Sequence, residues 1–151
     1  MPEPLPLVIR PLTAADQLDW RHLWRLYLAF YETELPEAVY ASTFARLLSG
    51  ASGEYRGFMA LSGGKAVGLA HYLFHRTCWA VENTCYLQDL YADATLRGKG
   101  IGRALIEAVY AAADREGAAS VYWMTQDFNT TARQLYDRIG VQTPFIEYNR
   151  G

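Results

Sequence analysis

The sequence predicts a single α/β (α+β) domain over residues 1–151, with a mixed, mostly antiparallel sheet and helices on both of its faces. Three observations lead to this fold class. The chain has the length of one typical domain, which is about 100 to 200 residues. Short apolar runs and segments of helical period follow one another in the order β-α-α-β-β-β-α-β-α-β. The strand–helix–strand unit from Thr84 to Gln126 predicts a central pair of parallel strands.

The first half of the chain begins with a short apolar strand, LVIRPL, at residues 7–12. Thr13, followed three residues later by Asp16, is close to a capping box, which predicts that a helix starts here. Apolar residues then recur every three or four positions from Leu18 to Tyr31, so one face of this helix can be buried against the sheet. Pro36 marks the start of a second helix, which the sequence SGASG ends.

The second half of the chain starts with a predicted hairpin. Its strands, at residues 58–61 and 66–76, flank Gly63 and Gly64, which supply the positive φ of a tight turn. A strand from Thr84 to Tyr91 comes next. The remaining predicted elements are a helix from Ile101 that Gly117 ends, a strand at residues 120–126, a helix from Asn129 to Gly140, and a last strand, PFIEY, at residues 144–148.

The composition is that of an ordinary globular protein, with 51% hydrophobic and 20% charged residues. Its formal net charge of −2 speaks against nonspecific binding to nucleic acid or to anionic lipid. No apolar stretch approaches the roughly eighteen residues that a membrane-spanning helix needs, and the start of the chain lacks a signal-peptide pattern. We therefore expect a cytoplasmic protein, with Cys78 and Cys85 as reduced, buried thiols.

A glycine-rich, basic segment precedes the helix that starts at Ile101. It contains three glycines and three basic residues, which are Gly98, Gly100, Gly102, Arg97, Lys99 and Arg103. The first N–H groups of a helix have no intrahelical partner and bind anions, phosphate above all. The glycines would let the backbone approach such a group and adopt positive φ, while the basic residues add charge. The spacing fits neither a dinucleotide fingerprint nor a Walker A loop, because Arg103 and Asp93 stand where those motifs need glycine.

Two motifs resemble those of the GNAT family, the Gcn5-related N-acetyltransferases. The segment RGKGIG is similar to the family's Q/R-x-x-G-x-G/A motif, with Arg97, Gly100 and Gly102 at its defined positions. The segment NTTARQLYDRIG, at residues 129–140, is similar to its N-x-x-A-x-x-L-Y-x-x-x-G pattern, and TPFIEYNR resembles the ending of its histone/polyamine acetyltransferase-like branch. The resemblance implies a GNAT-like fold and a single N-acetyltransferase domain, which transfers the acetyl group of acetyl-CoA directly to a primary amine.

For the cofactor site, the resemblance implies that the glycine-rich segment holds the diphosphate of acetyl-CoA. The pantetheine arm would pair with strand backbone at residues 90–92, where neighbouring parallel strands splay apart. Asn129 would contact this arm, unless it serves only as a helix cap. The cofactor-binding residues expected in this way are Leu90, Tyr91, Ala92, Arg97, Gly98, Lys99, Gly100, Ile101, Gly102, Arg103 and Asn129.

Acetyl transfer needs a neutral amine and a proton for the departing thiolate. The resemblance implies that Tyr136 faces the sulfur, where its phenol can donate this proton, unless Tyr136 serves only as a core residue. Some relatives carry a glutamate at the position of Gln88, but a glutamine cannot accept a proton, so we expect Gln88 to orient a water. That water would pass the proton to solvent or to a carboxylate such as Glu32 or Glu82. Strand alternation places Asp89 on the face opposite to Gln88, unless a bulge turns it inward.

The acceptor site is expected between the first two helices, where the resemblance suggests that the acceptor binds. Tyr27, Tyr31 and Glu32 supply aromatic faces and a carboxylate there, which together suit an ammonium group. The other interpretation of these residues is structural, with the tyrosines in the core and Glu32 as a solvated loop charge. His71 and His75 share one face of a strand, but no third ligand follows at metal spacing, so no metal is expected.

The sequence leaves the acceptor open. A small amine, such as a polyamine or an amino acid, is the first hypothesis, and a lysine side chain of a protein is the second. A non-catalytic acyl-CoA-binding or sensing module is the third, because Gln88 stands where a base is needed. The aromatic-rich segment at residues 71–86 and the last strand could also support a homodimer.

Overall fold

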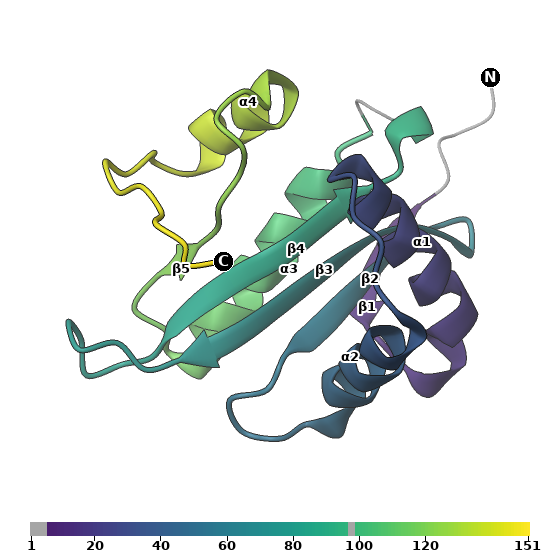
Figure 1. Cartoon of the computed structure of the whole chain (residues 1–151), viewed down its shortest axis with the longest axis horizontal. Coiled ribbons are helices and arrows are strands. Elements are labelled where there is room, and N and C mark those ends of the chain that lie inside the picture. The colour runs from purple at the N-terminus through teal and green to yellow at the C-terminus, as the bar shows by residue number, and fades with distance from the viewer. Residues whose placement is uncertain (1–5, 97–98) are drawn as a thin grey trace.

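A computed structural model describes residues 6–96 and 99–151, so Arg97 and Gly98 of the glycine-rich segment lie outside the described residues. Within this part of the chain, five strands form one sheet in the order β1-β2-β3-β4-β5 (Figure 1). Neighbouring strands are antiparallel except β4 and β5, which confirms the predicted mixed sheet with its parallel pair. The strands are β1 (Leu7–Pro11), β2 (Arg56–Ser62), β3 (Lys65–His75), β4 (Thr84–Ala92) and β5 (Val121–Tyr122).

Helices cover both faces of the sheet, as the sequence predicts. α1 (Gln17–Phe30) and α2 (Glu37–Ser49) lie on one face, and α3 (Ile101–Glu116) lies on the other (Figure 1). α4 (Thr130–Ile139) packs beside α3, where the Tyr110 hydroxyl donates a hydrogen bond to the Ile139 carbonyl at 2.8 Å. Among the helices of the described residues, none has the length and apolar character needed to cross a membrane.

α1 begins at the capping box that the sequence predicts. Asp16 closes a short 3-10 turn, Ala14–Asp16, and accepts a hydrogen bond from the Thr13 N–H at 2.7 Å. Two nitrogens of Arg10, on β1, bind the same carboxylate at 2.7 and 2.8 Å. These bonds, with that of Arg10 the largest cause, lower the pKa of Asp16 to about 2, so an ion pair ties the first strand to the first helix.

Each face of the sheet has its own hydrophobic core. On the side of α1 and α2, Trp20 and Trp24 stack with their ring centroids 5.1 Å apart and belong to a buried cluster with Met59 and Leu69. On the side of α3, a second cluster includes Cys85, and burial raises the pKa of this thiol to about 11. Cys85 is therefore a core residue, as predicted, with little of the thiolate character that reactive cysteines have.

The structure corrects four predictions, one of which is the central position of the parallel pair. Cys78 is exposed, because it lies in the loop between β3 and β4 and not in a strand. The strand expected at residues 120–126 is reduced to Val121–Tyr122. The last strand, at residues 144–148, is absent from the described chain, and Phe145 and Ile146 are 75% and 77% exposed. Because β5 is only two residues long, it offers the end of the chain no strand to pair with. The parallel pair β4–β5 lies at the edge of the sheet.

β4 contains a bulge at Gln88. His71 of β3 pairs with Asp89, and the next residue of β3, Tyr72, pairs with Leu87, so that Gln88 is an extra residue in β4. The extra residue resets the alternation along the strand. Simple alternation would place Gln88 and Asp89 on opposite faces, but the bulge turns Asp89 inward, which is the alternative that the sequence leaves open, and both side chains line one pocket on the side of α1 and α2.

Candidate active site

β4 and β5 separate soon after they meet. Their paired residues are Cys85 with Val121 and Tyr86 with Tyr122, and the chain after β5 leaves the sheet. From Asp89 onward, β4 pairs with β3 along one edge and with no strand of the described chain along the other. The pairing of β4 with β5 thus ends before residues 90–92, where the splay is predicted. Extended backbone with a free edge can form hydrogen bonds to a linear ligand, which suits a pantetheine arm at Leu90, Tyr91 and Ala92.

α3 begins with backbone N–H groups that no side chain of the described residues caps. Gly100, at the N-cap, has a φ of +75°, which favours glycine. Gly102 lies in the first helical turn and is not among the residues with positive φ, so the prediction for its φ is wrong. A Cβ at Gly102 would meet Leu135 of α4 at 3.6 Å, an ordinary contact distance. Packing within the protein therefore does not require this glycine, whereas a ligand approaching the amides would.

The basic and polar residues near this helix start are placed as follows. Lys99 is exposed. The Nε of Arg103 donates to Glu107 at 2.9 Å along α3, so Arg103 shares its charge with that carboxylate. Asn129 caps α4 by accepting a hydrogen bond from the Ala132 N–H at 3.4 Å. This cap is the structural role considered for Asn129, and its contact with a cofactor stays a prediction.

A buried carboxylate, that of Asp89, lies beside the free edge of β4. The Nδ1 of His71 is 2.8 Å from Oδ2 of Asp89, and the Nε1 of Trp24 donates to the same oxygen at 3.2 Å. The Nε1 of Trp20 donates to Nε2 of His71 at 2.9 Å. Because an indole can only donate, Nε2 of His71 accepts, and the neutral ring carries its proton on Nδ1 and donates it to Asp89. Two tryptophans and a histidine thus fix the orientation of one carboxylate.

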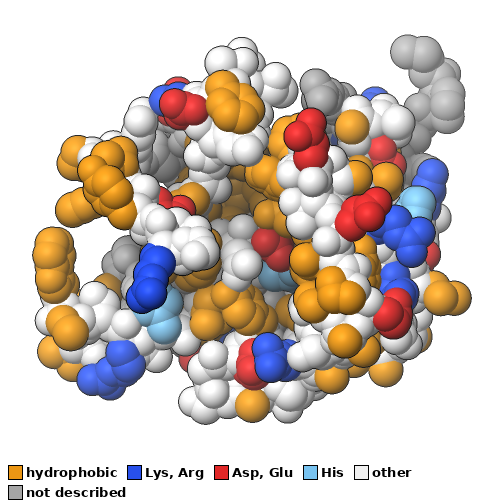
Figure 2. All heavy atoms as spheres, viewed as in Figure 1, with side chains coloured by type: hydrophobic (Ala, Val, Ile, Leu, Met, Phe, Trp, Pro, Cys, Tyr) orange, Lys and Arg blue, Asp and Glu red, His pale blue; other side chains and the backbone are white. Residues whose placement is uncertain are grey.

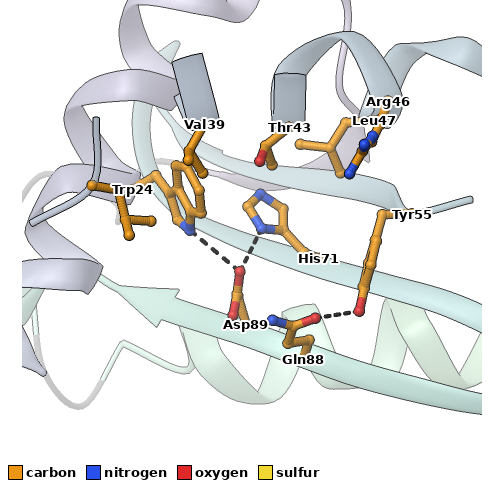
Figure 3. A pocket seen from close by; sticks show the side chains of 10 residues that line it. Trp24, Val39, Thr43, Arg46, Leu47, Tyr55, His71, Gln88 and Asp89 are labelled. Atoms are coloured by element: carbon orange, nitrogen blue, oxygen red, sulfur yellow. Dashed lines mark hydrogen bonds and ion pairs between the residues drawn. The ribbon is translucent and has the colours of Figure 1, made fainter. Parts of the chain in front are cut away.

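Asp89 lines a pocket of about 240 Å³ that β3, β4 and α2 also border (Figure 3). At its edge, the amide oxygen of Gln88 accepts a hydrogen bond from the Tyr55 hydroxyl (Figure 3). In the space-filling view, this face of the molecule is hollowed, with hydrophobic side chains around the hollow (Figure 2). Among the lining residues, Asp89 is the one carboxylate, because Arg46 is the other charged side chain and the rest are uncharged.

Tyr27 and Tyr31, near the end of α1, lie close enough to feel the charge of Asp89 but do not line its pocket. Their rings meet edge to face, with the centroids 5.1 Å apart. Burial and the nearby Asp89 carboxylate raise the pKa of both hydroxyls. Glu32 follows them in an exposed turn with a φ of +54°. Neither Glu32 nor the exposed Glu82 lines the pocket, so the structure does not bring these predicted proton acceptors to Gln88.

Tyr136 lies on α4, where its ring packs edge to face against Trp123 at a centroid distance of 5.6 Å. Burial raises the pKa of its hydroxyl to about 12, and the neighbouring Tyr31 adds to this shift. The phenol is therefore protonated at neutral pH, as a proton donor must be. The influence of Tyr31 on Tyr136 indicates that the end of α1 lies near α4.

The sequence-based predictions place Gln88 at the site and consider Asp89 only if a bulge turns it inward, and they assign no role there to Trp24, Arg46, Tyr55 or His71, which also line the pocket. One signal could have found Asp89. Two adjacent polar residues, Gln88 and Asp89, interrupt an otherwise apolar strand, and such an interruption is typical of a bulge beside a functional site. His71 was considered as a metal ligand, whereas the structure uses it to hold Asp89. Within residues 6–96 and 99–151, no group of three or more His, Cys, Asp or Glu side chains is arranged to hold a metal ion.

Known proteins resemble this chain in sequence and in structure. It is 38% identical over 146 residues to the D-amino-acid N-acetyltransferase HPA3 of Saccharomyces cerevisiae, across 95% of this chain and 90% of that protein. It is 34% identical over 76 residues to the thialysine N-epsilon-acetyltransferase of Bos taurus, across 50% of this chain and 44% of that protein. The structure of AAC(6')-Iy in complex with a bisubstrate analog of CoA superposes with a TM-score of 0.84 at 18% identity, covering 97% of this chain and 98% of that one. At this identity, the superposition shows a shared fold.

The family itself is recognised along most of the chain. The model of the acetyltransferase (GNAT) family matches residues 20–141, from α1 to the end of α4. The match includes the free edge of β4, the glycine-rich start of α3 and Tyr136. Acetyl-CoA is therefore the expected co-substrate, and we expect these elements to bind it. The assignment to the histone/polyamine acetyltransferase-like branch stays a prediction. The chain therefore belongs to the GNAT family of acetyltransferases.

Proposed function

We propose that this enzyme transfers the acetyl group of acetyl-CoA directly to the primary amine of a small molecule, with Asp89 as the residue that receives the amine. The observation behind the proposal is the position of this buried, firmly oriented carboxylate beside the free edge of β4. The pocket of about 240 Å³ supports a small acceptor, since pockets for drug-sized ligands measure roughly 300–1,000 Å³.

Acetyl-CoA would be bound jointly by the start of α3 and by the open half of β4, which is the part with a free edge, Gln88–Ala92. The N–H groups of Ile101, Gly102 and Arg103 would bind its diphosphate, aided by Lys99 and, from the predicted motif, by Arg97 and Gly98. The backbone of residues 90–92 would bind the pantetheine arm, and Asn129 would contact this arm from α4. When bound, the thioester supplies an activated acetyl group, and these contacts direct it toward Asp89.

Asp89 would first bind the acceptor as an ammonium ion. An alkylammonium has a pKa near 10.4, so about one molecule in a thousand is neutral at pH 7. One proton must therefore leave the ammonium, by way of the water at Gln88, before the nitrogen has a lone pair for the attack; as the nitrogen–carbon bond then forms, the nitrogen becomes much more acidic and the Asp89 carboxylate can take a second proton. The His71 hydrogen bond keeps the Asp89 carboxylate aimed at this position. Gln88 would orient a water that carries the proton on to solvent.

Tyr136 would donate the proton that the departing thiolate needs. Its pKa of about 12 keeps the phenol protonated at neutral pH. Of the two protons that the ammonium loses, one replaces the proton given by Tyr136 and one reaches solvent. No covalent bond to the protein is required, which agrees with the buried position of Cys85.

Tyr27, Tyr31 and Glu32 stay candidates for acceptor binding. The two tyrosines lie close enough to the Asp89 carboxylate to feel its charge, which supports a place beside the ammonium. Glu32 is exposed, and we propose that it acts only on the approach of a cationic substrate.

The test of this function follows thiol release from acetyl-CoA with panels of polyamines, amino acids and lysine peptides. Release with small amines is expected, whereas release with peptides alone would indicate a protein lysine acetyltransferase. Tight binding of acetyl-CoA with no release above the blank would indicate a sensing module. Tyr136→Phe should lower kcat roughly tenfold or more while the affinity for CoA is kept.

Two further expectations stay predictions: a cytoplasmic location and a homodimer. The exposed apolar side chains of Trp79, Phe145, Ile146 and Tyr148 support a homodimer, because they would otherwise face water. Light scattering at two protein concentrations measures the oligomeric state.

A further inference from the structure

The pocket beside Asp89 has opposite charges on two of its walls. Asp89 belongs to β4, and Arg46 belongs to the last turn of α2, where its side chain extends between those of Leu47 and Tyr55 (Figure 3). The remaining lining side chains are uncharged, since the bond from Trp20 keeps His71 in its neutral form. A ligand that fills this pocket therefore meets one negative and one positive group.

We infer that the acceptor is an amino acid, whose amine is held by Asp89 and whose carboxylate is bound by Arg46. The inference rests on the proposed function and names its substrate class. A guanidinium presents parallel N–H groups that match a carboxylate, so Arg46 is suited to this role. The apolar side chains of Leu35, Val39 and Leu47 line the same pocket and offer a surface for the side chain of the amino acid.

The same charges disfavour a polyamine. With its first amine at Asp89, a short diamine would bring a second ammonium toward Arg46, where like charges repel each other. An amino acid places a carboxylate there and gains an attraction. Arg46 thus acts as a specificity-determining residue that selects amino acids over polyamines of similar size.

Arg46 has a weak partner that the substrate can replace. Its Nε lies 3.9 Å from Oε1 of Glu54, and the two side chains are 65% and 32% exposed. Glu54 is itself held by the Tyr55 N–H, which donates to Oε2 at 3.0 Å. An ion pair this long and this exposed to water contributes little, so an incoming carboxylate can take the place of Glu54. Removal of the Glu54 charge should then strengthen the binding of an amino acid.

The test compares leucine with isopentylamine, which differ by one carboxylate, as acceptors of the wild-type enzyme and its variants. Leucine is supplied in its D and L forms, because the charges do not define the chirality. Wild-type enzyme should have the higher kcat/KM for at least one form of leucine. Arg46→Ala should lower that value roughly tenfold, through KM, and leave the value for isopentylamine unchanged. Arg46→Lys should restore part of the loss, and Glu54→Gln should lower the KM for leucine.

Arg115→Ala is the matched control, because Arg115 is exposed in the last turn of α3 on the opposite face of the sheet. This variant should leave both acceptors unaffected. An equal loss for leucine and isopentylamine in Arg46→Ala, or a wild-type preference for isopentylamine, would overturn the inference and leave the proposed function standing.

A binding measurement separates the inference from the proposed function. Saturation-transfer NMR with CoA present detects leucine bound to the protein without any turnover. Loss of this signal in Arg46→Ala supports the inference even if no amine releases thiol from acetyl-CoA, in which case the proposed function alone fails. An undiminished signal in Arg46→Ala overturns the inference.

Discussion

The two halves of β4 have opposite surroundings. Thr84–Leu87 lies between β3 and β5 in the sheet, and its side chains Cys85 and Leu87 are 0% and 1% exposed. Gln88–Ala92 begins with the bulge, pairs with β3 alone and contains the two polar residues of the strand that line the pocket. The part of β4 that is paired along both edges thus contributes to the hydrophobic core, and the part with one free edge contributes to the candidate active site.

This fold separates residues that stabilise it from residues that can bind ligands. In the closed half, backbone groups are satisfied by neighbouring strands and side chains by the α3-side core, so a change there should affect folding. In the open half, the backbone edge and the Asp89 carboxylate are available to ligands, so a change there should affect binding and turnover.

Asp89→Asn should have the largest effect, because it removes the proposed proton acceptor while keeping its size. Losses of roughly a hundredfold to ten-thousandfold are typical for a general base, and we expect kcat/KM to fall at least a hundredfold. Steady-state rates measure this effect, and calorimetry should find the affinity for CoA little changed. Turnover at the wild-type level would show that the amine is received elsewhere.

Leu87→Ala should have the largest effect on folding. Removal of a fully buried leucine side chain typically costs about 2–5 kcal/mol of unfolding free energy, and we expect a loss in this range from urea titrations. Leu90→Ala, in the open half, is the matched variant. Leu90 is only partly buried, so its loss should be clearly smaller. Equal losses of unfolding free energy at the two positions would contradict the distinction between the two halves of β4.

Asp16→Asn contrasts a structural carboxylate with that of Asp89. The pKa of Asp16 is lowered to about 2, so its ionised form stabilises the fold above the ordinary value of about 3.9, and this stabilisation is lost as the pH falls toward 2. Because Arg10 is partly exposed, we expect the variant to lose about 1–2 kcal/mol at pH 7. The difference from wild type should shrink between pH 4 and pH 2 in urea titrations, and kcat should not change. A difference that does not depend on pH would contradict this role for the ion pair.

Gly102→Ala should have the smallest effect, with opposite signs on folding and binding. Alanine favours a helix interior by roughly 0.5–1 kcal/mol over glycine, and Leu135 leaves room for the new methyl group. The unfolding free energy should therefore rise slightly. The methyl group would crowd a diphosphate at the α3 amides, and we expect the Kd for CoA to increase about tenfold, as for one lost charge-assisted hydrogen bond. Unchanged affinity for CoA in calorimetry would place the diphosphate elsewhere.

The sequence predicts those parts of the site that depend on local chemistry. The glycines before Ile101 predict a helix start with free amides, because residue type carries this information, whereas the role of Tyr136 as proton donor is implied by the resemblance to the family and stays a prediction. The bulge at Gln88 depends on how β3 and β4 pair, and strand alternation therefore gives the wrong face for Asp89. Arg46 and Tyr55 reach the pocket through the packing of α2 and the segment before β2, which no local pattern encodes. The strand predicted at residues 144–148 fails for a related reason, since a strand needs a partner as well as an apolar sequence.

The most direct test of the account is hydrogen exchange of individual amides, followed by NMR with and without CoA. Binding of CoA should slow exchange at the α3 start, Ile101–Arg103, and along the open half of β4, Leu90–Ala92, and should leave Thr84–Leu87 almost unchanged. Protection confined to other regions, in a protein that demonstrably binds CoA, would contradict the claim that the open half of β4 and the uncapped start of α3 together form the cofactor site.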